Sequence, residues 1–201
     1  MGRSRHSSID RRFAARWIPA FAGMAWWVAA ACLAPPALAD QTDPRLDQLF
    51  AELKTTPDGP DARGLEAQIW SIWMRSGDEE VSRLLEAGDL AMQASQYDAA
   101  LAAFNKVVEK APDFAEGWNK RATLFYLMGN YPASLADIAR TLKLEPRHFG
   151  ALSGLGLVEV QLDKPEEALA AFEKALAIDP HLDEARSNAE QLRQQIQQRQ
   201  I

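Results

Sequence analysis

The chain has 201 residues, 47% of them hydrophobic and 25% charged, which is the balance of a globular protein and excludes a collagen, a disordered tail and a disulfide miniprotein. Five of its 22 basic residues and one of its 28 acidic residues lie at positions 1–39. Residues 40–201 therefore carry 17 basic against 27 acidic side chains, a net charge of −10. That charge repels phosphate backbones and argues against nucleic acid as a partner.

Residues 1–39 are predicted to be a signal peptide for secretion. Five arginines lie between positions 3 and 16, and the segment that follows carries no charge up to the small residues Ala37 and Ala39. A basic segment, an apolar segment and small residues before a cleavage point are the parts of such a signal, so we expect cleavage after Ala39. Two alternatives stay open, because the apolar segment is long enough for an uncleaved membrane anchor and Cys32 is a candidate for lipidation.

A repeat organises the rest of the chain, with prolines at equal intervals at Pro112, Pro146 and Pro180. Small and apolar residues recur at fixed offsets before each proline: Ala100, Phe104 and Val107, then Ser134, Ile138 and Thr141, then Ala168, Phe172 and Ala175. Steps of four and three place each trio on one face of a helix. An earlier apolar face occurs in every unit, so each unit is predicted to contain two helices.

Turns are predicted between the two helices of each unit, because Gly, Asn, Asp and Pro favour turns over helix continuation. They fall at Ser95-Gln96, Gly129-Asn130 and Asp163-Lys164-Pro165. The repeating prolines lie where each second helix must end, since proline lacks the N–H donor and restricts the residue before it. Neither helix of a unit buries its apolar face alone, whereas three stacked units form a continuous core.

These residues resemble the tetratricopeptide repeat family, in units 81–114, 115–148 and 149–182. The matching residues are Gly88, Ala100, Phe104, Trp118, Leu155, Gly156, Ala168, Phe172, Ala175 and the three prolines. The resemblance covers half of the chain, without an insertion between units. It implies an all-α fold, namely an α-solenoid of antiparallel helix pairs with three repeat units and helical caps.

Two residues depart from the family pattern. Arg121 stands where the family usually has Leu, and Glu159 where it usually has an aromatic residue. In one interpretation, the aliphatic parts of both side chains pack on the core while their charged ends reach water. In the other, the two side chains form an ion pair between neighbouring repeats.

The flanking segments are predicted to cap the array. Residues 40–80 are interpreted as a degenerate half-repeat, because Trp70 and Trp73 lie one repeat period before Phe104 and Val107. Both tryptophans are expected in the core rather than on a ligand platform. Residues 183–201 are predicted to be a C-terminal capping helix whose buried face carries Ala185, Ala189, Leu192 and Ile196.

No catalytic residue, metal site or cofactor is predicted, and an enzyme is the least favoured class. Residues 40–201 hold only two histidines, His148 and His181, and no metalloprotease motif, phosphate loop or serine elbow. Both histidines lie close to a repeat-ending proline, and we expect them to face solvent in loops.

Binding is the remaining function, and the resemblance implies its location, since the first helices of tetratricopeptide arrays line a concave groove. The positions that it implies for partner binding are Leu85, Asp89, Met92, Asn119, Lys120, Thr123, Tyr126, Ser153, Leu157 and Val160. Gly150 and Gly154 leave a bare patch beside them. Polar groups there suit an extended peptide backbone, with Met92, Tyr126 and Leu157 taking its side chains.

A carboxylate clamp of the kind that grips chaperone tails needs Lys or Arg together with Asn at set groove positions. Only Asn119 and Lys120 fit that pattern, while Leu85, Asp89 and the two glycines occupy the other places. An acidic protein is expected to recruit a neutral or basic segment instead.

The sequence therefore predicts a non-enzymatic protein–protein interaction adaptor of the bacterial envelope, exported to the periplasm. Its partner is a protein or peptide segment held in the groove, with no small-molecule substrate and with membrane contact only through the N-terminus. The alternative is a structural subunit that associates with itself through its terminal helices, including the helix of Trp70 and Trp73.

Overall fold

The computed structural model describes residues 41–199, and this part of the chain is all-helical, without a strand. Its helices are α1 (Arg45–Thr55), α2 (Pro60–Trp73), α3 (Glu79–Gln93), α4 (Tyr97–Lys110), α5 (Ala115–Leu127), α6 (Tyr131–Leu144), α7 (Phe149–Gln161), α8 (Pro165–Ile178) and α9 (Asp183–Arg199). Among them, no helix combines the length and the hydropathy that a membrane span requires. The predicted signal peptide and its alternatives, an anchor or a lipid on Cys32, lie outside the described residues.

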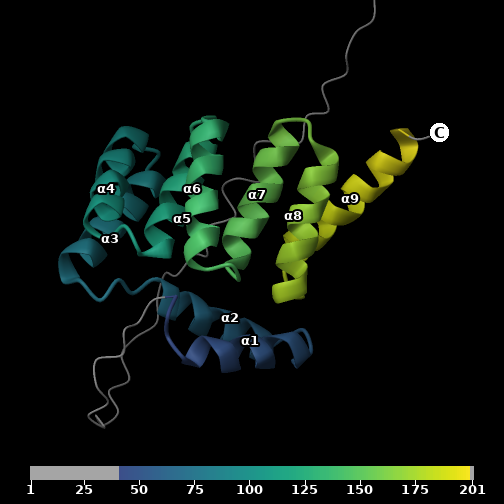
Figure 1. Ribbon diagram of the computed structural model, residues 1–201, viewed down its shortest axis with the longest axis horizontal. Helices are drawn as coiled ribbons and strands as arrows, with labels where there is room; N and C mark the ends of the chain where they lie inside the picture. Colours follow the sequence, from purple (N-terminus) through teal and green to yellow (C-terminus); the bar gives the residue numbers. More distant parts are fainter. Residues whose placement is uncertain (1–40, 200–201) are drawn as a thin grey trace, which may run out of the picture. The chain divides into compact units, whose positions relative to one another are not determined.

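Helices α3 to α8 form three pairs, α3–α4, α5–α6 and α7–α8, which follow one another in chain order, and α9 packs against α8 (Figure 1). The second helices end at Lys110, Leu144 and Ile178, at equal intervals and each just before a repeating proline. The predicted α-solenoid of helix pairs is confirmed.

The turns within the pairs repeat with the same period. Ser95, Gly129 and Asp163 each adopt a positive φ, of 58°, 74° and 56°. The residue after each donates its backbone N–H to a carbonyl five positions earlier in the ending helix, for example Gln96 N to Ala91 O at 2.8 Å. Glycine adopts this conformation without a steric cost, whereas the exposed Ser95 and Asp163 adopt it with the turn hydrogen bond that follows each of them.

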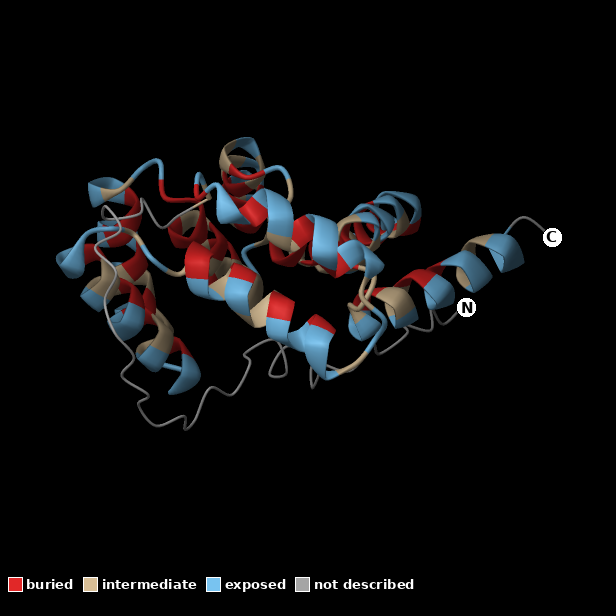
Figure 2. Ribbon diagram, turned by 90° about the horizontal axis from the view of Figure 1, so that it is seen from below, coloured by how far each residue is buried: buried red, intermediate tan, exposed pale blue. Residues whose placement is uncertain are grey.

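In the first and third pairs, a glycine on one helix faces a phenylalanine on the next. A Cβ atom added at Gly88 would lie 2.3 Å from Cε1 of Phe104, and one at Gly156 would lie 2.7 Å from Cζ of Phe172. Both phenylalanines are fully buried. Along the helices of the described part, buried residues alternate with exposed ones, so that each helix has a buried and an exposed side (Figure 2).

The N-terminal hairpin α1–α2 does not stack on α3 as the predicted half-repeat. It lies across one end of the later helix pairs (Figure 1) and shares a hydrophobic cluster with Phe149, Ile178 and Leu182. The agreement of Trp70 and Trp73 with the repeat period is therefore misleading. The connection from α2 to α3 contains Gly77, which has a φ of 73°. The apolar face of α2 packs against the start of α7, where Trp70 contacts Phe149, instead of against α3.

Two polar contacts fasten the hairpin to the array. Arg147 Nη1 donates to Asp47 Oδ1 at 2.6 Å, and the guanidinium lies 4.6 Å from the ring centre of Phe50. The ring of His181 bonds through Nε2 to the carbonyl oxygen of Leu53 at 3.1 Å. Both tryptophans were predicted in the core: Trp73 is buried, with 1% of its surface exposed, whereas Trp70 is only partly buried and packs against the same cluster.

The C-terminal helix α9 packs against α8 at the end of the array, and Ile196 of its predicted buried face is only partly buried. Ala185, Ala189 and Leu192 are buried in one cluster with Ala168 and Phe172 of α8. The opposite side of α9 is rich in Gln and Arg and faces solvent. This polar side ends the continuous core of the stacked units.

Candidate functional site: the first-helix face and its buried polar network

Four of the ten predicted groove residues are buried, which corrects their assignment as partner contacts. Leu85 and Met92 of α3 belong to the cluster that contains Phe104 and Leu124. They are buried because α3 packs against both α4 and α5. Asn119 and Ser153 are also buried, with 8% and 3% of their surface exposed.

Asp89 and Lys120, two further predicted groove residues, neutralise each other. Lys120 Nζ lies 3.0 Å from Asp89 Oδ2. The side chain of Lys120 is 21% exposed and that of Asp89 is 16% exposed. Burial raises the pKa of Asp89 above its usual range, and the ammonium of Lys120 opposes that shift. The second carboxylate oxygen of Asp89 is buried without a hydrogen-bond partner among the described residues.

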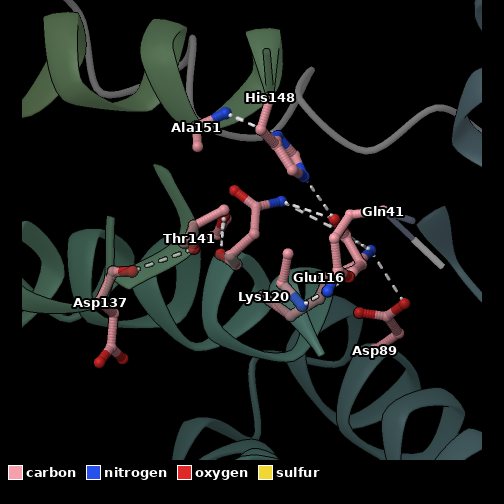
Figure 3. A network of polar contacts seen from close by, with 11 residues as sticks. Gln41, Asp89, Glu116, Lys120, Asp137, Thr141, His148 and Ala151 are labelled. Atoms are coloured by element: carbon pink, nitrogen blue, oxygen red, sulfur yellow. Dashed lines mark hydrogen bonds and ion pairs between the residues drawn. The ribbon is translucent and has the colours of Figure 1, made fainter. Parts of the chain in front are cut away.

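Glu116, at the start of α5, is the centre of this polar network (Figure 3). Its side chain is fully buried and receives three hydrogen bonds, one from His148 at 2.9 Å and two from the amide of Asn119 at 3.1 and 3.3 Å. Lys120 Nζ lies 3.9 Å from its Oε1 atom. A buried carboxylate is tolerated when donors and a cation surround it, and Glu116 meets both conditions.

His148 is not the solvent-facing loop residue that the sequence suggests, because its side chain is fully buried. Its Nδ1 accepts the backbone N–H of Ala151 at 3.1 Å and so caps the start of α7. A backbone N–H only donates, so Nε2 of this imidazole carries the hydrogen that Glu116 receives. Trp73 stacks on the same ring, with centroids 4.2 Å and planes 11° apart.

His181 also differs from the prediction, since its side chain is only 8% exposed. It lies between α8 and α9 and bonds to the hairpin through Leu53. Both histidines thus serve packing between segments far apart in the sequence. The network of Glu116 was missed because a single carboxylate at a helix start is equally typical of a solvated first turn.

The ion pair proposed between Arg121 and Glu159 does not form. Arg121 makes a two-pronged contact with Asp137, at 2.7 and 2.9 Å, and donates to Asn105 at 2.8 Å. Glu159 Oε2 instead lies 3.4 Å from Lys164 Nζ, without hydrogen-bond geometry. Asp137 is the nearer partner because α6 packs directly on α5.

The remaining predicted residues lie on α5 and α7 and are neither fully buried nor engaged in ion pairs. They are Thr123, Tyr126, Leu157 and Val160. Burial raises the pKa of Tyr126, whose ring lies 6.0 Å from that of Tyr131. Trp70 covers the bare patch expected at Gly150, since its Cη2 atom lies 2.8 Å from a Cβ built there. Gly154 stays partly exposed.

Among residues 41–199, no group of three or more His, Cys, Asp or Glu side chains is arranged to hold a metal ion. A cleft of about 450 Å³ with both polar and apolar lining lies between α1 and α2, bordered by Arg45, Glu52 and Leu65 among others. It lies on the hairpin and apart from the predicted groove positions.

Comparison with known proteins assigns the family. The family model described as tetratricopeptide repeat matches residues 85–128 and 119–183. A tetratricopeptide repeat-containing protein of Rhizobium etli is 40% identical over 136 residues, which are 68% of this chain and 67% of the relative. The chain belongs to the tetratricopeptide repeat family.

More distant relatives match a shorter part of the chain. The small glutamine-rich tetratricopeptide repeat-containing protein 2 of Mycosarcoma maydis is 29% identical over 106 residues, so the match spans 51% of this chain and 30% of that relative. The first tetratricopeptide domain of Spaghetti, solved with an HSP90 peptide, superposes with a TM-score of 0.57. It is 22% identical over 59% of this chain and 94% of that domain, which shows a shared fold.

Proposed function

We propose that this protein is a non-enzymatic adaptor that binds an extended segment of a partner protein on the face formed by α5 and α7. The observation that carries the proposal is the set of half-buried side chains there, Thr123, Tyr126, Leu157 and Val160. An aromatic and two aliphatic groups supply apolar anchors through the parts that are not packed against the core. The hydroxyl of Thr123 donates to Asn119 O at 3.0 Å, so towards an extended backbone it acts as an acceptor. The Spaghetti domain, which has the same fold, was solved with a peptide.

The partner segment is proposed to be neutral or basic rather than a free carboxylate tail. Asn119 and Lys120, the pair that fits a carboxylate clamp, are both engaged, by Glu116 and by Asp89. An acidic tail would have to break the ion pair of Lys120 and approach Glu116 as well. Residues 40–201 carry a net charge of −10, which favours a segment of opposite charge.

Selection of peptides tests this proposal. A displayed library of random peptides is enriched on the full chain, and the affinity of an enriched peptide is measured by calorimetry. Leu157→Ala and Tyr126→Ala are each expected to weaken binding by about tenfold, as anchors at the centre of an interface do. Leu162→Ala is the matched control, because Leu162 is an exposed leucine beyond the end of α7. If all three variants bind the peptide as tightly as the parent does, the binding site lies elsewhere on the chain.

We further propose that the chain is exported to the periplasm of a bacterium and acts in an envelope assembly. The basic and apolar N-terminal segment supports this proposal. Cell fractionation combined with mass spectrometry of the N-terminus tests it, and a mature protein beginning at Asp40 is the expected product. An intact N-terminus, or a mature protein that begins at a lipidated Cys32, would contradict cleavage after Ala39 and indicate an anchor instead.

Self-association is the second candidate, and Leu90 is the observation in its favour. This residue on α3 is 60% exposed, and α2 does not cover it. Self-association through Trp70 and Trp73 is not supported, because both contact α7. Light scattering tests this candidate: a monomeric protein would count against self-association, whereas a self-associating subunit is expected to lose its oligomer in a Leu90→Glu variant.

A further inference from the structure

Leu90 of α3 stands at a position of the repeat that is buried in the two later units. Leu90, Leu124 of α5 and Val158 of α7 follow one another at equal intervals along the chain. Leu124 and Val158 are 0% and 1% exposed, whereas Leu90 is 60% exposed. The same position is therefore a core position in two units and a surface position in the first.

The two buried residues are covered by the preceding unit. Leu124 packs into the cluster that contains Phe104 of α4, and Val158 packs into the cluster that contains Ile138 of α6. The pair α3–α4 lies at the end of the row of helix pairs opposite to α9 (Figure 1), so within residues 41–199 no stacked pair precedes it. In this part of the chain, no second helix covers Leu90 as α4 covers Leu124.

The hairpin α1–α2 does not take this position, and Arg83 supplies a steric reason. Arg83 stands at the repeat position of Gly117, where a Cβ atom would lie 2.6 Å from Cγ1 of Val107. The preceding helix thus approaches α5 closely at a residue without a side chain. Trp73 stands at the repeat position of Val107, so on α3 its indole would meet Arg83 instead of a glycine. Trp73 stacks on His148 in place of such a contact.

The exposed side of α3 is amphipathic and acidic. Ala87 and Leu90 of α3 and its C-cap residue Ala94 are exposed at steps of three and four, and together they form an apolar stripe. Helix α3 carries four acidic residues against one basic residue, Arg83. Among them, Glu86 is exposed next to the stripe and forms no ion pair with another described residue. Such a surface favours a partner of opposite charge, whereas a second copy of α3 would bring like charges together.

We propose that the apolar stripe of α3 docks a basic, amphipathic helix of a partner protein, which lies where the second helix of a preceding repeat would lie. The apolar side of this helix covers Leu90, and its Lys or Arg side chains lie near Glu86. Helices α4 and α6, which cover the equivalent positions, have 14 residues each, so a helix of about four turns is long enough. The stripe is separate from the groove residues on α5 and α7, so this inference does not rest on the proposed groove.

Selection from a displayed library of helical peptides tests this inference. Each peptide has the length of α4, with Leu and Ala fixed along one face and the other positions drawn from Lys, Glu, Gln and Ala. The library is enriched on the full chain, and the affinity of the enriched peptides is measured by calorimetry at low and at high salt. We expect Lys to exceed Glu in the enriched peptides, and their affinity to fall as the salt concentration rises.

Two variants with matched controls locate the site. Leu90→Ala is expected to weaken binding about tenfold, because it removes the central apolar contact. Leu162→Ala, at another exposed leucine, should bind as the parent does. Glu86→Gln is expected to weaken binding about two- to fivefold, as the loss of an exposed ion pair does, whereas Glu190→Gln on α9 should have no effect. All four side chains are exposed, so these variants keep the fold.

Several results would overturn the inference. A library that yields no binder, binders rich in Glu, or equal binding by the parent and Leu90→Ala would each do so. Light scattering that shows an oligomer of the parent, lost in Leu90→Glu, would assign the stripe to a second copy instead. Weaker binding of the enriched peptides by Tyr126→Ala would place them in the groove. Failure of the groove proposal leaves these measurements unchanged, because its peptides are selected and tested separately.

Discussion

The indole of Trp73 and the imidazole of His148 lie parallel, with ring centroids 4.2 Å apart, and this contact joins the N-terminal hairpin to the buried network of Glu116. His148 thereby performs three tasks with one ring. It caps α7 through Nδ1, donates to α5 through Nε2, and offers its face to α2. Three segments far apart in the sequence meet at this side chain.

Removing the carboxylate of Glu116 is expected to destabilise the fold strongly. Glu116→Ala leaves the imidazole of His148 and the amide of Asn119 without an acceptor in a buried site. The expected loss is roughly 2 to 4 kcal/mol in the free energy of unfolding, measured by urea denaturation. Glu109→Ala, at an exposed position of α4, is the control and should stay within about 0.5 kcal/mol of the parent. Similar midpoints for the two variants would contradict the role of Glu116 as the centre of the network.

Two glycine-to-alanine changes are expected to act in opposite directions. Gly88→Ala places a methyl group against the ring of Phe104, at 2.3 Å, and should cost about 1 to 3 kcal/mol through overpacking. Gly64→Ala lies in α2, where a Cβ atom meets nothing within 4 Å. It should stabilise the chain by about 0.5 to 1 kcal/mol, because alanine loses less backbone entropy in a helix. Thermal unfolding of both variants gives the comparison, and a stabilised Gly88→Ala would show that the pair can spread apart.

Double-mutant cycles are expected to assign the partner of Arg121. The cycle of Arg121→Ala with Asp137→Ala should give a coupling energy of about 1 to 2 kcal/mol, since the two side chains form a partly buried, two-pronged contact. The cycle with Glu159→Ala should give a coupling within about 0.3 kcal/mol of zero. Denaturant unfolding measures both. The reverse order of coupling energies would restore the ion pair between neighbouring repeats.

The repeat itself could be predicted from the sequence because its signals are local. Helix faces follow from steps of three and four along the chain, and turns follow from residues such as Gly129 that adopt a positive φ at little cost. The family resemblance then placed the first helices on one face. It could not say which side chains on that face stay accessible, and Leu85 and Met92 proved to be core residues.

The position of the hairpin, the burial of His148 and the partner of Arg121 were decided only by the tertiary structure. The spacing of Trp70 and Trp73 fits the repeat period, yet an apolar helix face packs wherever a complementary surface lies within reach of its connection. Polar partners such as Glu116 and His148 are 32 positions apart and belong to different segments. Sequence periodicity therefore determined the helices and their pairing, because these depend on neighbours along the chain. The docking of non-repeating segments depends on shape and charge matched across space, and only the folded chain brings those together.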